Sequence, residues 1–76
     1  MLLRLRRERL ERGLSIPTVA RQAKVSKVTL QLVETGITVP YPAMRKKLAE
    51  YYGVKEHVLF RDIDAAQRYL REVAGK

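Results

Sequence analysis

The sequence predicts an all-α fold of five packed helices followed by a sixth, and two serines provide the first evidence. Ser15 and Ser26 stand eleven residues apart, and each precedes apolar residues at helical spacing. A serine hydroxyl at such a position accepts a bond from an unpaired backbone N–H, which stabilises the helix start by about 1 kcal/mol. Residues 21–25 between the two starts suffice only for a helix end and a turn. We therefore expect two short helices, over residues 16–23 and 27–35, that form a helix-turn-helix.

Three further helices complete the predicted bundle, and glycines mark where two of them end. The first covers residues 2–12, with leucines on one face, and stops at Gly13. A fourth helix begins at Pro42, whose ring suits a first turn, and stops at Gly53. The inward-facing residues of this helix and of a short fifth one are Met44, Leu48, Ala49, Tyr52, Val54, Val58, Leu59 and Phe60.

The end of the chain carries its own start signal and its own apolar stripe. After Asp62 and Asp64 begin the segment, helical spacing aligns Ile63, Ala66, Tyr69, Leu70 and Val73. We therefore divide the chain into a domain over residues 1–61 and a C-terminal helix over residues 62–76. The stripe needs a cover. Either the helix folds back on the five-helix body, or it meets its copy in a second subunit, which predicts a homodimer through residues 63–73.

Composition and charge narrow the class of function. Residues 1–55 hold 12 Lys or Arg and 4 Asp or Glu, whereas residues 56–76 hold 4 of each, so the net charge of +8 lies on the body. A basic body with a neutral tail is typical of a protein that binds a polyanion. The chain has no cysteine, one histidine (His57), and no apolar run of the ~18 residues that a membrane span requires. We expect a cytoplasmic protein without enzymatic activity, cofactor, metal or small-molecule ligand.

This sequence resembles the Cro/repressor-type helix-turn-helix family, also called xenobiotic-response-element-like, in the run GLSIPTVARQAKVSKVTLQLVETG and the later Pro40 and LAEYYGV. The resemblance covers roughly residues 5–60 and implies a repressor-like bundle that binds palindromic DNA as a dimer. It further implies that Arg9 pairs with Glu34, the alternative being two solvated charges. Ala20 is a small residue where the two helices cross, and Gly36 ends the second of them. Together with the ion pair, the residues expected to have a structural role are Arg9, Ala20, Glu34 and Gly36.

The second helix of a helix-turn-helix enters the major groove, so its outward side chains are the candidates for reading bases. These are Lys27, Val28, Thr29, Gln31 and Leu32. Lys27 can donate to guanine, Gln31 can pair with adenine, and Val28 can touch a thymine methyl. The candidates for phosphate contact are Ser15, Thr18, Lys24, Ser26, Thr35, Arg45 and Lys46. Where the family has a phosphate-binding glutamine after the cap, this chain has Ile16, so we expect a weaker clamp there.

The sequence thus predicts sequence-specific binding of double-stranded DNA by a transcriptional regulator, a repressor of phage or bacterial type, with residues 27–35 as recognition helix. One feature of this helix favours an alternative. Val28 and Leu32 lie four residues apart and would form an exposed apolar pair. In the alternative, the same fold is a protein–protein interaction module that binds its partner through this pair.

Overall fold

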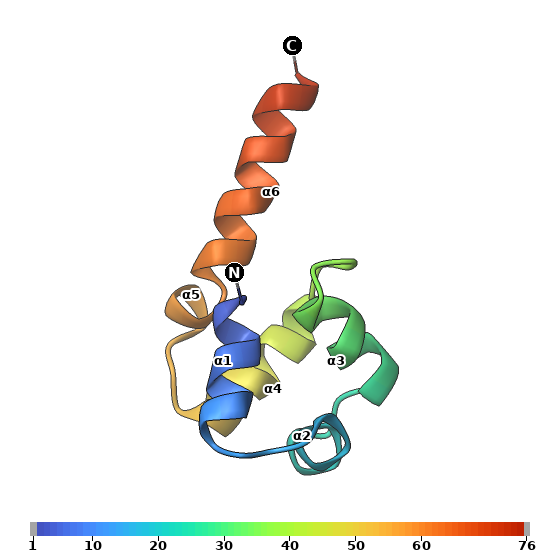
Figure 1. The fold of residues 1–76 in the computed structure, drawn as a ribbon. Helices are drawn as coiled ribbons and strands as arrows, with labels where there is room; N and C mark the ends of the chain where they lie inside the picture. The colour runs from blue at the N-terminus through green and yellow to red at the C-terminus, as the bar shows by residue number, and fades with distance from the viewer. Residues whose placement is uncertain (1, 76) are drawn as a thin grey trace.

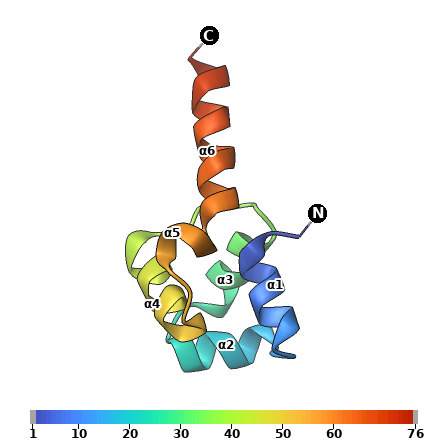
Figure 2. The same cartoon turned by 90° about the vertical axis from the view of Figure 1, so that its left-hand side faces the viewer.

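The computed structural model describes residues 2–75, and within them the chain forms six α-helices and no strand. Five helices pack into a small body, from which the sixth projects (Figure 1 and Figure 2). The predicted all-α class is confirmed. The helices are α1 (Arg4–Glu11), α2 (Ile16–Ala23), α3 (Lys27–Glu34), α4 (Pro42–Tyr52), α5 (Glu56–Leu59) and α6 (Arg61–Ala74). Residues 1 and 76, the outer limits of the two predicted segments, lie outside the described part of the chain.

Both predicted serine caps form. The hydroxyl oxygen of Ser15 accepts the N–H of Thr18 at 3.2 Å, and that of Ser26 accepts the N–H of Thr29 at the same distance. Between the two helices, Lys24 adopts the left-handed conformation (φ 60°, ψ 49°) and ends α2. The chain therefore turns within a few residues, and α2 and α3 pack directly against each other as a helix-turn-helix.

The helix ends differ from the predicted bounds by one or two residues. α1 starts at Arg4, because the residue before it has an extended backbone, and α3 ends at Glu34, because Thr35 serves as its C-cap. α5 starts only at Glu56, so Val54 packs on the core from the preceding loop. α6 starts at residue 61, one earlier than expected. Such ends depend on cap geometry more than on the apolar pattern from which they were predicted.

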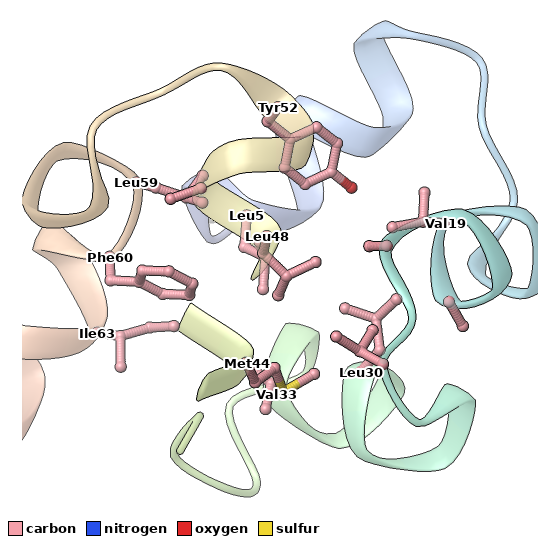
Figure 3. Close-up of a cluster of buried hydrophobic side chains, with 14 residues drawn as sticks. Leu5, Val19, Leu30, Val33, Met44, Leu48, Tyr52, Leu59, Phe60 and Ile63 are labelled. Carbon is pink, nitrogen blue, oxygen red and sulfur yellow. The ribbon is translucent and has the colours of Figure 1, made fainter. Parts of the chain in front are cut away.

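A single core joins all five helices of the body (Figure 3). Burying such side chains stabilises the fold by about 1.5–3 kcal/mol each. The leucine face of α1 turns inward only in part, because Leu5 is buried whereas Leu2 and Leu10 are exposed. Ala20, the small residue predicted at the helix crossing, is buried. The largest fully buried side chains are Phe60, Leu5, Leu30, Met44, Leu48, Leu59, Val19 and Val33.

α6 does not fold back on the body. Its first turn is anchored, because Ile63 is buried in the core and Asp62 accepts the backbone N–H of Arg4 at 2.7 Å. Beyond this turn the helix extends away from the other five (Figure 2). Tyr69, Leu70 and Val73 are all more than half exposed. Of the two predicted ways to cover the apolar stripe, packing on the chain's own body is therefore confined to Ile63, and it is wrong for Tyr69, Leu70 and Val73.

Candidate nucleic-acid interface

The helix α3 has one buried and one exposed face. Leu30, Val33 and Glu34 are buried and hold the helix against the body. On the other side, Lys27, Val28 and Gln31 are exposed, and they lie within about one turn of each other. Thr29 and Leu32, the remaining two predicted base-reading residues, are half-buried at the edges of this face. We call Lys27, Val28 and Gln31 the α3 strip.

The exposed apolar pair expected on α3 is not formed. Val28 is 64% exposed, but Leu32 is half-buried. The carbonyl oxygen of Leu32 also accepts the N–H groups of Ile37 and Thr38 at 2.9 and 3.3 Å, which hold the following loop against the end of α3. A single exposed valine is an ordinary surface feature. The observation behind the protein-interaction alternative is therefore reduced to one side chain.

A buried ion pair fixes α3 to α1. The Nε of Arg9 donates to both carboxylate oxygens of Glu34 at 3.0 and 2.9 Å, and its Nη2 donates to one of them at 2.9 Å. Its Nη1 donates to the carbonyl oxygen of Leu14 at 2.8 Å, just before α2. These bonds to Glu34 raise the pKa of Arg9. The predicted pair is confirmed, and because Arg9 is itself buried, it is not free to meet a phosphate.

The residues predicted to contact phosphates lie in three places: the start of α2, the turn before α3, and the segment after α3. Ser15 and Thr18 share the start of α2, where the Ser15 hydroxyl donates to that of Thr18 at 2.9 Å. Lys24 and Ser26 are exposed in the turn that leads to α3. The remaining three follow α3 in the chain: Thr35 and Lys46, which are exposed, and Arg45, which is half-buried.

Arg45 is committed to carboxylates of the chain itself. Its Nη1 and Nη2 donate to the two oxygens of Asp64 at 2.8 and 3.0 Å, and its Nε donates to Glu56 at 2.9 Å. The guanidinium also lies 4.6 Å from the centre of the Phe60 ring. Arg45 thus fastens α4 to α5 and to the base of α6. We leave it out of the phosphate-contacting set, because every donor nitrogen is already bonded.

Other basic side chains of the helix-turn-helix remain open to solvent. Across residues 2–75, no ion pair involves Lys24, Lys27 or Lys46. Lys47 of α4, which is not among the predicted phosphate contacts, lies beside the turn and donates to the carbonyl oxygen of Lys24 at 3.2 Å. The α3 strip and the turn before it therefore carry positive charge that no carboxylate neutralises.

The described part of the chain offers neither a metal site nor a membrane span. Residues 2–75 hold no group of three or more His, Cys, Asp or Glu side chains arranged to bind a metal ion. Every helix in this range is too short or too polar to cross a membrane.

Comparison with known families connects this geometry to a function. A model described as a helix-turn-helix domain matches residues 2–60. The chain belongs to the helix-turn-helix domain family. This membership indicates DNA binding and a non-enzymatic role in transcription regulation. The matched residues take in α1 to α5 of the helix-turn-helix domain and stop just before α6. Searches of curated proteins and of solved structures gave no match.

Proposed function

We propose that this protein binds double-stranded DNA sequence-specifically, as a Cro/repressor-type transcriptional repressor of a bacterium or phage, acting on DNA in the cytoplasm. The observation that carries the proposal is the α3 strip. It is exposed and carries the positive charge of Lys27, while the inner face of the same helix is fixed by the core and by the Arg9–Glu34 pair. A rigid helix that presents polar side chains to solvent has the form that a major groove admits.

The α3 strip supplies chemistry for reading bases. Lys27, at the first position of the helix, donates to guanine O6 or N7. Gln31 follows one turn later and pairs with adenine, and Val28 between them packs on a thymine methyl. Thr29 and Leu32 border the strip, so we assign them contacts at its edges.

Phosphates on either side of the groove are bound by groups around the helix-turn-helix. Ser15 and Thr18 surround the N-terminus of α2, where backbone N–H groups and the helix dipole attract anions. Lys24 and Ser26 reach a phosphate from the turn. Thr35 and Lys46 contact the strand beyond α3, although the Thr35 hydroxyl also donates to the carbonyl oxygens of its own helix at 3.0 and 3.1 Å.

We further propose that two copies of the chain join through residues 63–73. Beyond the buried Ile63, the stripe on α6 is exposed and lies outside the matched family domain, and covering it would remove its apolar surface from water. A two-fold dimer places two α3 helices in successive major grooves. The two half-sites then lie about 34–36 Å apart.

Selection of bound sites from a random duplex pool tests the function directly, because it reports binding, half-site spacing and symmetry together. We expect a palindromic site and an affinity that falls steeply between about 50 and 200 mM salt, as phosphate contacts release counterions. Lys27→Ala should weaken binding and relax the preference at one base position. Lys55→Ala is the matched control, since it removes one exposed lysine from the start of α5. Equal effects of the two substitutions would contradict base reading by α3.

A further inference from the structure

A small apolar cleft lies between the loop after α3 and the base of α6. One wall is formed by Ile37 and Val39 of the loop, and the other by Ala66 and Leu70 of α6. The volume is about 140 Å³, and Leu3, Val33, Gly36, Thr38, Ile63 and Gln67 complete the lining. In Figure 1 the loop rises from the end of α3 to about the height of the base of α6. We call this feature the loop cleft.

The loop beside the cleft has an ordered backbone but exposed apolar side chains. The N–H of Ile37 bonds to the carbonyl oxygen of Leu32 at 2.9 Å, and Pro40 is buried. Yet Ile37 is 73% exposed, Val39 is 47% exposed, and neither belongs to the core. Exposed apolar side chains on an ordered loop indicate a surface that meets another molecule.

The loop cleft continues into the apolar stripe of α6. Leu70 belongs to both, and Tyr69 and Val73 extend the same stripe toward the end of the helix. A stable interface needs about 800 Å² and roughly 20–30 residues from each partner. The three large exposed side chains of one 14-residue helix cannot supply this alone. The loop residues, with Tyr41 beside them, are the apolar surface that enlarges it.

Charge favours a second copy of the chain as the occupant. Residues 61–74 contain three arginines (61, 68 and 71) and three carboxylates (62, 64 and 72), so α6 has no net charge, whereas the whole chain carries +8. Two copies of α6 can therefore approach each other without the repulsion that two basic bodies would feel.

The direction of packing follows from which end of α6 has to reach the loop cleft. Val73 lies seven residues beyond Ala66, or about 10 Å along the helix axis. In a two-fold dimer each contact occurs twice, with the partners exchanged. If the two α6 helices run antiparallel, the end of each stripe returns to the base of the other helix, which is where the loop cleft lies.

We propose that the loop cleft receives the C-terminal half of α6 from a second copy of the chain. The two α6 helices pack antiparallel, and Tyr69 and Val73 of each copy contact Ile37 and Val39 of the other. This inference deepens the dimer of the proposed function and rests on it. It also connects the interface to DNA reading, because the loop is bonded to the end of α3. Dimer formation thus stabilises the position of the recognition helix α3.

Sedimentation equilibrium of the full chain without DNA is the first test. We expect a dimer whose dissociation constant rises at least tenfold in Ile37→Asp and in Leu70→Glu. Val28→Asp is the matched control, because it places the same charge on an exposed apolar residue of α3 outside the loop cleft. Circular dichroism verifies that all three variants fold. An unchanged dimer in Ile37→Asp, or a wild-type monomer at micromolar concentration, would overturn the inference.

Disulfide trapping tests the direction of packing, and the natural absence of cysteine makes it clean. An equimolar mixture of Ile37→Cys and Val73→Cys chains should give a cross-linked pair on oxidation, because a disulfide requires Cα atoms within about 7 Å. Either variant alone should stay uncross-linked. Rapid cross-linking of Val73→Cys with itself would indicate parallel helices and refute the arrangement.

The two proposals can fail separately. A chain that dimerises with the expected cross-links but binds no duplex would refute only the DNA-binding function. A chain that binds a palindromic duplex, and whose dimer is insensitive to Ile37→Asp, would refute only the loop cleft.

Discussion

The substitution Glu34→Ala removes one partner of the ion pair that joins α1 to α3. The side chain of Glu34 is 1% exposed and that of Arg9 is 10% exposed, and three hydrogen bonds of 2.9–3.0 Å link them. Removing the carboxylate leaves a guanidinium in the protein interior with only the carbonyl of Leu14 as acceptor. Breaking a buried pair in this way costs about 3–5 kcal/mol.

That loss is large against the stability of so small a protein. At about 0.05–0.15 kcal/mol per residue, a 76-residue chain has a free energy of unfolding of about 4–11 kcal/mol. Glu34→Ala should therefore remove about a quarter of it or more. The double substitution Arg9→Met with Glu34→Leu should restore most of the stability, because an apolar pair of similar volume often replaces a buried ion pair without loss.

Urea unfolding followed by circular dichroism measures these differences, provided that the denaturant dependence stays the same among variants. Glu8→Ala is the control. Glu8, whose side chain is 14% exposed, pairs along α1 with Arg4 and Arg12, whose side chains are 37% and 38% exposed. Helix pairs with solvent-exposed partners contribute about 1 kcal/mol or less. A loss below about 1 kcal/mol in Glu34→Ala, or one equal to that of Glu8→Ala, would refute the reasoning that burial makes this pair decisive.

Two further predictions separate stability from function. Lys24→Gly should raise the free energy of unfolding by about 1 kcal/mol, because a residue with a Cβ is strained at φ 60°. The same change should weaken duplex binding and reduce the slope of its salt dependence by about 1, as expected for the loss of one phosphate contact. Unchanged affinity in a binding assay would show that Lys24 does not contact DNA. Bonding to Arg45 lowers the pKa of Asp64 in the folded protein. As pH falls, Asp64 is therefore protonated in the unfolded chain before it is protonated in the folded protein. The pair with Arg45 stabilises the fold above about pH 4, and this stabilisation is lost at lower pH. In urea unfolding at pH 6 and pH 3, Asp64→Asn should show a smaller loss of stability than wild type, and equal losses would contradict the assignment.

The sequence by itself determined where most helices begin and which residues form the core. These signals are local. A serine cap acts on an N–H three residues later, a left-handed glycine ends the helix beside it, and apolar spacing identifies an inward face without reference to the rest of the chain. The capping roles of Ser15, Ser26 and Gly53, and the burial of Leu30 and Leu48, therefore follow from their near neighbours in the sequence.

Tertiary structure decided which charged groups are free and where α6 points. Arg45 looked like a phosphate ligand, but its partners Glu56 and Asp64 lie 11 and 19 residues further along and reach it only after α5 has turned back. The direction of α6 and the loop cleft beside Ile37 likewise depend on contacts between distant segments. Side chains that look equivalent in the sequence differ in the fold, because packing decides whether a charge meets a carboxylate or solvent.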